Sequence, residues 1–134
     1  MAKKRIVVLA TGGTIAGVGE AGKDSGYVSG QISGEALVAS VPELAEYADV
    51  VAEQVCNVNS DDITDKIWIA LSRRIAELQE DDTVDGIVVT HGTDTMDETA
   101  YFVSSSVIRQ KLGLMENDTN LSNFLHDLFK NTVR

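Results

Sequence analysis

The sequence contains one cysteine, one proline and two histidines among its 134 residues, and these scarcities limit what the protein can be. With Cys56 alone, no intrachain disulfide can form. Its apolar neighbours Val55 and Val58 favour a buried structural thiol over a nucleophile. The histidines and the cysteine lie far apart in the chain and give no spacing typical of a metal site, so we expect no metal or other cofactor.

Basic side chains are also scarce, since 11 Lys and Arg stand against 21 Asp and Glu, a net charge of −10. A phosphate backbone would need a basic face, so we expect no nucleic acid partner. No apolar run approaches the roughly 18 residues of a membrane helix, and we expect no membrane partner. The first apolar run breaks at Thr11, too early for a signal peptide, which predicts a cytoplasmic protein unless a signal has been removed.

The sequence does contain short β-branched runs that alternate with helical patterns. Strands are expected at residues 5–9, 50–55 and 86–90, and helices at residues 35–40, at 63–80 and from Met96 onward. This alternation implies right-handed crossovers between parallel strands. The predicted fold class is therefore α/β, a three-layer α/β/α domain with a mainly parallel sheet.

The clearest amphipathic helix is expected at residues 63–80, where Ser60 or Asp61 would cap the amino end. Six apolar side chains fall on one face of this helix: Ile63, Ile67, Ala70, Leu71, Ile75 and Leu78. The strand that follows, at residues 86–90, is expected to be fully buried because its residues form a continuous apolar run.

Two of the expected strands lead directly into hydroxyl-bearing and glycine residues. The first is followed by ATGGTIAG at residues 10–17, and the third leads into THGTDTMDETAYF at residues 90–102. Because open α/β sheets bind ligands at the carboxyl ends of their strands, we expect Thr14, Ser60, Thr93 and Asp94 to gather at one edge of the sheet. A long loop over residues 11–30, rich in glycine, is expected to be functional or mobile.

These two motifs, in this order and at a domain-like separation, resemble those of the bacterial L-asparaginase family, over roughly residues 4–102. The resemblance implies an amidohydrolase that converts L-asparagine, or L-glutamine, to the acid and ammonia through an acyl-threonine intermediate. Such chemistry needs a positioned hydroxyl, a base and donors for the oxyanion, because an amide is a poor electrophile. The resemblance also implies a homo-oligomer, which is a tetramer in the family.

By resemblance, Thr14 matches the nucleophile, and Tyr27 matches the tyrosine of a loop that would close over the substrate. Thr93 and Asp94 match two members of a Thr-Lys-Asp triad. Ser60 resembles the serine that binds the substrate α-carboxylate, and Asp94 would also meet the substrate ammonium.

Gly12, Gly13 and Gly92 of the motifs are expected to offer close backbone approach and bare N–H groups, and Gly13 and Gly92 are assigned to substrate binding. Asp61 stands where many type II members have glutamine, which leaves the preference between asparagine and glutamine open. His91 is interpreted mainly as a support for the strand end.

After Phe102 the resemblance stops, and residues 103–134 are interpreted as a divergent or truncated helical tail behind an asparaginase-like domain at 1–102. The triad lysine has no match, since Lys111 lies too near Thr93 in sequence. Two alternatives remain: an inactive fragment, and a nucleotide-binding α/β domain. The second is weaker, since the glycines do not follow G-x-G-x-x-G and Glu53 only loosely matches a ribose-binding acid.

Overall fold

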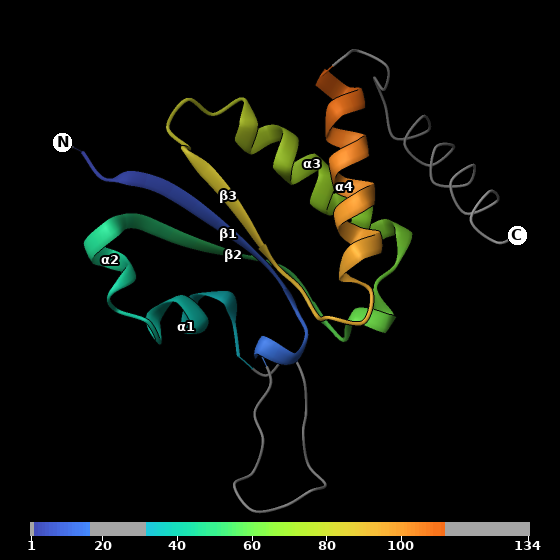
Figure 1. The fold of residues 1–134 in the computed structure, drawn as a ribbon, viewed down its shortest axis with the longest axis horizontal. Coiled ribbons are helices and arrows are strands. Elements are labelled where there is room, and N and C mark those ends of the chain that lie inside the picture. The colour runs from blue at the N-terminus through green and yellow to red at the C-terminus, as the bar shows by residue number, and fades with distance from the viewer. Residues whose placement is uncertain (1, 17–31, 112–134) are drawn as a thin grey trace, which may run out of the picture.

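A computed structural model describes residues 2–16 and 32–111, which form one parallel sheet between two layers of helices (Figure 1). The elements in chain order are β1 Lys4–Gly12, the 3₁₀ turn η1 Thr14–Ala16, α1 Gly34–Ala39, α2 Leu44–Tyr47, β2 Ala48–Val58, the 3₁₀ turn η2 Ser60–Asp62, α3 Asp65–Gln79, β3 Gly86–Thr90 and α4 Met96–Lys111. The three strands are parallel and follow the order β2-β1-β3. The predicted α/β class and the parallel sheet are confirmed.

The helices divide between the two faces of the sheet, as the alternation of side chains along β1 requires. Val7 and Leu9 point to one face, where they pack against Leu71, Ile75 and Leu78 of α3 to form the main core. Ala10 points to the other face, where its Cβ lies against Gly34 at the start of α1. Figure 1 shows α1 and α2 on one side of the strands and α3 and α4 on the other. The predicted three-layer arrangement is therefore present.

The connections of β1 and β3 leave the sheet toward opposite faces. The chain passes from β1 to α1 on one face, and from β3 to α4, which packs against α3 on the other. Neighbouring strands with connections on opposite faces leave a crevice between their carboxyl ends, and open α/β sheets bind ligands there. The topology thus places the expected site between the ends of β1 and β3.

The ends and faces of α3 differ from the prediction. Its cap is Thr64, whose hydroxyl accepts a hydrogen bond from the Ile67 backbone N–H at 3.4 Å, whereas Ser60 and Asp61 lie earlier, in the separate turn η2. Ala70, expected in the core, is exposed, and Trp68 and Ser72 are buried instead. The reason is tertiary, because α4 packs beside α3 and covers the flank of the helix that carries Trp68 and Ser72.

Strand β3 is only partly buried, contrary to the expectation for its apolar run. Among the described residues it pairs with β1 alone, and Val88, on the same face as α1, is 47% exposed. The helices on that face contact β1 and β2 rather than β3, which leaves Val88 open. In the part of the chain that the structure describes, no helix is long and apolar enough to cross a membrane.

Helix α4 joins α3 through a stacked pair of rings and a buried pair of hydroxyls. The rings of Trp68 and Phe102 lie 5.2 Å apart between centroids, and the hydroxyls of Ser72 and Ser106 lie 2.9 Å apart. The helix runs through residue 102 without a break and is described as far as Lys111. The boundary expected at 102 therefore falls inside a helix. Residues 103–111 of the expected tail belong to α4, and residues 112–134 lie outside the described residues.

Candidate active site

The ends of the three strands meet through two glycines and a serine. Gly13 has a φ of +78°, and a Cβ at this position would lie 2.5 Å from the Gly92 backbone nitrogen. A Cβ on Gly92 would in turn lie 2.8 Å from the Ser60 hydroxyl oxygen. Side chains cannot fit at these distances, so both glycines are required for the backbone segments to touch. Segments that follow β1, β2 and β3 therefore converge at one point.

Ser60 is buried, and its hydroxyl joins the turn η2 to the loop after β3. The hydroxyl donates a hydrogen bond to the Asp94 carboxylate at 3.1 Å and accepts one from the Asp94 backbone N–H at 3.3 Å. The Thr95 hydroxyl donates to the Ser60 carbonyl at 2.7 Å. The loop after β3 is thus held against η2 by three hydrogen bonds, and the Asp94 carboxylate is oriented by one of them.

Hydrogen bonds between the strand ends hold these residues together from below. The Thr11 hydroxyl donates to the Thr90 carbonyl at 2.7 Å, which ties β1 to β3. The Gly13 backbone N–H donates to the Val58 carbonyl at 2.9 Å, which ties β1 to β2. The expectation that Gly13 offers a bare N–H to the substrate is therefore wrong, because that group is already bonded within the sheet.

Cys56 also belongs to this bracing rather than to the chemistry. It is partly buried, and its thiol donates to the Thr11 carbonyl at 3.3 Å. Burial raises the pKa of the Cys56 thiol above its usual value, which keeps it protonated and unreactive. The interpretation of Cys56 as a structural thiol agrees with these contacts.

Of the residues predicted for the site, the structure brings Gly13, Ser60, Gly92 and Asp94 together. Thr93 lies between Gly92 and Asp94 and is exposed, and Asp61 is exposed on η2. The backbone of Thr14 begins η1 directly after Gly13, but its side chain lies outside the described part of the chain. Tyr27 and the expected lid also lie outside it. Ala16 and Ile32, which flank that segment, are joined by a hydrogen bond of 2.9 Å.

His91 supports the strand end from behind, through contacts with residues that were not anticipated from the sequence. Its Nδ1 lies 2.7 Å from the Gly92 carbonyl oxygen, and its Nε2 lies 2.8 Å from the Thr99 hydroxyl. Thr99 in turn accepts a hydrogen bond from the Trp68 indole N–H at 2.8 Å. The only tryptophan in the sequence could have indicated such contacts, because a buried indole N–H usually has an acceptor.

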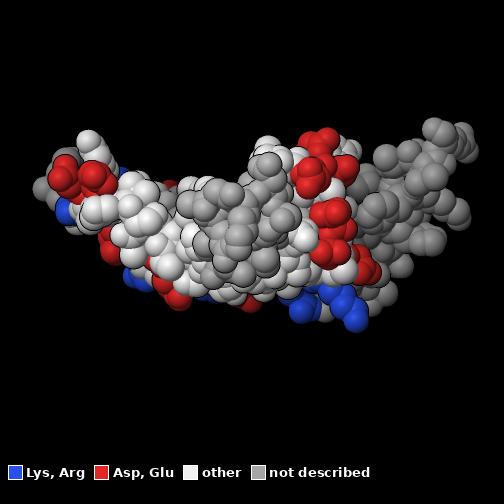
Figure 2. Space-filling model, turned by 90° about the horizontal axis from the view of Figure 1, so that it is seen from below, with Lys and Arg blue, Asp and Glu red and all other residues white. Residues whose placement is uncertain are grey.

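The surface around the strand ends is acidic. Exposed carboxylates in this region belong to Asp61, Asp62, Asp94, Asp97 and Glu98. Figure 2 shows a band of acidic side chains on one part of the face seen from below, with basic side chains gathered at the lower edge of the view, next to one end of the band. Such a surface suits the ammonium group of an amino acid and opposes an anionic phosphate.

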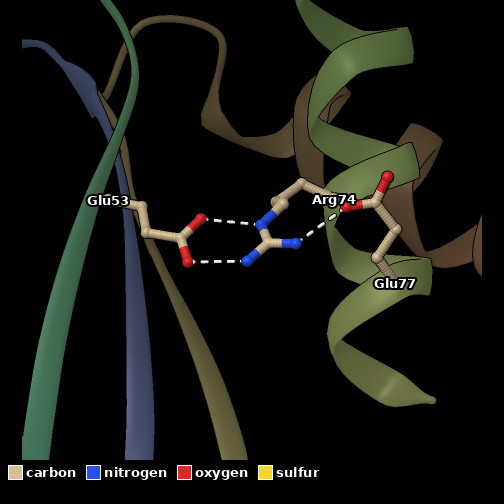
Figure 3. A network of polar contacts seen from close by, with 3 residues as sticks. All are labelled: Glu53, Arg74 and Glu77. Carbon is tan, nitrogen blue, oxygen red and sulfur yellow. Dashed lines mark hydrogen bonds and ion pairs between the residues drawn. The ribbon is translucent and has the colours of Figure 1, made fainter. Parts of the chain in front are cut away.

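Glu53, the acid that a nucleotide site would have needed, is engaged elsewhere. It faces α3 from β2 and forms two hydrogen bonds with the Arg74 guanidinium, 2.7 Å from Nε and 2.8 Å from Nη2 (Figure 3). Arg74 also contacts Glu77 at 2.7 Å. This pairing lowers the pKa of the Glu53 carboxyl and joins α3 to the sheet. Glu53 is therefore not free to bind a ribose, and the nucleotide-binding alternative loses the acidic residue on which it depended.

Among the described residues, no cluster of His, Cys, Asp and Glu is arranged to hold a metal ion.

Comparison with known proteins agrees with the family resemblance of the two motifs. A family model described as "Asparaginase, N-terminal" matches residues 5–112. The chain is 44% identical over 126 residues to L-asparaginase 2 of Escherichia coli, a match that covers 91% of this chain and 36% of that protein.

Two further comparisons agree. The chain is 49% identical over 100 residues to the glutaminase-asparaginase of Pseudomonas fluorescens, covering 74% of this chain and 28% of that protein. The crystal structure of a probable cytoplasmic L-asparaginase from Campylobacter jejuni superposes with a TM-score of 0.70 at 45% identity, covering 75% of this chain and 31% of that one. The protein thus has an α/β fold with the two motifs at the ends of its strands. The chain belongs to the asparaginase family, whose N-terminal part it matches.

The family match extends beyond the sequence motifs. It reaches residue 112, ten residues further than the resemblance that could be recognised in the sequence, and includes the whole of α4. The chain spans about a third of the length of the relatives that it matches.

Proposed function

We propose that the protein acts as an amidohydrolase that hydrolyses L-asparagine to aspartate and ammonia. The observation that carries this proposal is the convergence of Gly13, Ser60, Gly92 and Asp94 at the carboxyl ends of the strands. The family match over residues 5–112 and relatives named L-asparaginase and glutaminase-asparaginase support it.

In the proposed reaction, the Thr14 hydroxyl adds to the side-chain amide carbon of the substrate, and its proton is passed to the amide nitrogen that leaves. The tetrahedral intermediate then expels ammonia and leaves an acyl-threonine ester, which water hydrolyses to aspartate and free Thr14. Tyr27, Thr93 and Asp94 are assigned to the proton transfers and to the positioning of the reacting groups. Thr14 directly follows Gly13, so its backbone is anchored to the crevice by the bond between Gly13 and Val58.

The amino acid end of the substrate is assigned to Ser60 and Asp94. Their side chains are already joined, so a substrate that offers a carboxylate to Ser60 and an ammonium to Asp94 would meet both at once. The Ser60 hydroxyl must then turn from Asp94 toward the substrate carboxylate, while the new ammonium compensates Asp94. Asp61 lies exposed on the same turn and adds negative charge for the ammonium.

Ammonia release from L-asparagine and L-glutamine by the full-length protein tests this function. We expect release from asparagine, lost in Thr14→Ala and strongly reduced in Thr93→Ala. Thr83→Ala is the matched control, because Thr83 precedes β3 at the opposite end of the strand. If the wild type releases no ammonia, the function is wrong, and if both site variants keep the full rate, the residue assignment is wrong.

The assembly and the compartment form a further part of the proposal. We expect a homo-oligomer, as the family resemblance implies. We expect it in the cytoplasm, since the structural relative from Campylobacter jejuni is described as a probable cytoplasmic enzyme. Size-exclusion chromatography with light scattering tests the oligomeric state, and cell fractionation tests the compartment. A monomer in solution would contradict the first, and recovery in the periplasm would contradict the second.

A further inference from the structure

A line of hydrogen bonds runs from α3 through α4 to the end of β3. The Trp68 indole N–H bonds to the Thr99 hydroxyl at 2.8 Å, and this hydroxyl lies 2.8 Å from His91 Nε2. The other ring nitrogen, Nδ1, lies 2.7 Å from the Gly92 carbonyl oxygen. Trp68 and Thr99 are only 7% and 4% exposed, so water competes little for these contacts. The line ends at the glycine that touches both Gly13 and Ser60.

The chemistry of the two ends sets the direction of every bond. An indole nitrogen can only donate, and a carbonyl oxygen can only accept. At 2.7 Å from the Gly92 oxygen, His91 Nδ1 must carry a proton, because otherwise two lone pairs would face each other. In a neutral ring Nε2 then has no proton and accepts from the Thr99 hydroxyl. Thr99 uses its oxygen to accept from Trp68, so every polar atom in the line has one consistent role.

We propose that His91 is a positioning residue, held as the neutral Nδ1–H tautomer by Thr99 and Trp68, that fixes the Gly92 carbonyl and so the segment bearing Thr93 and Asp94. Its importance for catalysis rests on the proposed function. Both ring nitrogens already have partners, Gly92 and Thr99, so the imidazole has no free lone pair for the proton of a threonine nucleophile.

Because the contacts at Gly92 are close, the orientation of its peptide affects the segments around it. The Gly92 peptide lies between Gly13 and Ser60, where even a Cβ would not fit. A rotation of this peptide would press it into one neighbour and draw Thr93 away from the end of β1. A displacement of this kind in an active site costs rate even when no substrate contact is removed.

The tautomer can be measured directly by nuclear magnetic resonance, independently of activity. The full-length protein is labelled with ¹⁵N-histidine, and His91→Gln identifies the signals of residue 91. At pH 8, where an ordinary imidazole is neutral, we expect the long-range proton–nitrogen pattern of the Nδ1–H form. An Nε2–H pattern for His91 in the wild type would overturn the proposal.

A matched pair of variants tests the part of Thr99. Thr99→Val keeps the shape of the side chain and removes the hydroxyl, whereas Thr99→Ser keeps the hydroxyl. We expect the Nε2–H form to become populated in Thr99→Val and the wild-type pattern to persist in Thr99→Ser. An unchanged tautomer in Thr99→Val, or the same change in both variants, would contradict the role of Thr99.

The kinetic result separates positioning from a general loss of stability. We expect kcat for asparagine to fall on the order of tenfold in Thr99→Val with little change in KM, and to recover in Thr99→Ser. A normal kcat in Thr99→Val together with a changed tautomer would show that the ring does not position the site. If even the wild type releases no ammonia while His91 shows the Nδ1–H pattern, the proposed function fails and the assignment of the ring stands.

Discussion

The Ser60 hydroxyl donates to the Asp94 carboxylate at 3.1 Å and accepts from the backbone N–H of the same residue at 3.3 Å. These two residues are 34 positions apart in the sequence and follow different strands. Their reciprocal bonds orient a carboxylate beside the crevice between β1 and β3. The pair is therefore the part of the site in which a single substitution should be most informative.

Replacing Ser60 with alanine should weaken the binding of aspartate, the reaction product, by about 10- to 100-fold. The reason is that a hydrogen bond to a charged group contributes about 1.5–3 kcal/mol, and Asp94 also loses its orienting partner. Isothermal titration calorimetry measures the change. Ser104→Ala on the exposed side of α4 is the control and should bind aspartate normally. Equal affinity of Ser60→Ala and wild type would exclude Ser60 from substrate binding.

Replacing Gly13 with alanine should lower the free energy of unfolding by at least about 2 kcal/mol, because the residue has a positive φ and its Cβ would meet the Gly92 nitrogen. Gly86→Ala is a matched control, since there a Cβ meets only the end of the Ile6 side chain at 3.0 Å. Denaturation with urea compares the two. Similar stabilities for both variants would show that the contact between Gly13 and Gly92 is not close in solution.

The ion pair between Glu53 and Arg74 should make stability depend on pH at the acidic end. Hydrogen bonding to Arg74 lowers the pKa of the Glu53 carboxyl in the folded state. Its stabilising contribution is therefore complete above the pKa of an unfolded glutamate and is lost as pH falls through the lower folded value. The side chains of Arg74 and Glu53 are 38% and 34% exposed, so solvent screening limits the contribution to about 0.5–1 kcal/mol.

Urea denaturation between pH 7 and pH 3 measures this dependence. Glu53→Gln should be less stable than the wild type at pH 7 and should approach it at pH 3. Glu77→Gln, which removes a single contact at a more exposed carboxylate, should change stability less. A constant difference between Glu53→Gln and wild type over this range would rule out the ion pair as its cause.

The buried hydroxyls of Ser72 and Ser106 should respond unequally to substitution. Ser106 donates its proton to the Val103 carbonyl at 3.0 Å, so Ser72 is the donor in the bond between the two hydroxyls. Ser106→Ala leaves the buried Ser72 proton without its acceptor and should cost about 1–3 kcal/mol. Ser72→Ala leaves Ser106 bonded to Val103 and should cost less. A double-mutant cycle measures both, and the two effects should not be additive.

The sequence alone determined the positions of the strands and of the two motifs that follow them along the chain. Short β-branched runs specify strands locally, and all three predicted strands are present, although β1 and β2 extend beyond the predicted residues. The two motifs at residues 10–17 and 90–102 lie at the ends of neighbouring parallel strands. Their position at one edge followed from the alternation of strands and helices, because parallel strands end on the same side.

Only the tertiary structure decided which groups are available at that edge. The Gly13 N–H, expected to be free, donates to Val58 because β1 continues through Gly12, which pairs with Val58 after a shift in register. The burial of Trp68 and Ser72 in place of Ala70 depends on the side on which α4 packs, and the exposure of Val88 depends on which strands α1 and α2 cover. Residue periodicity records the conformation of one element, whereas these contacts depend on the register and packing of several elements distant in sequence.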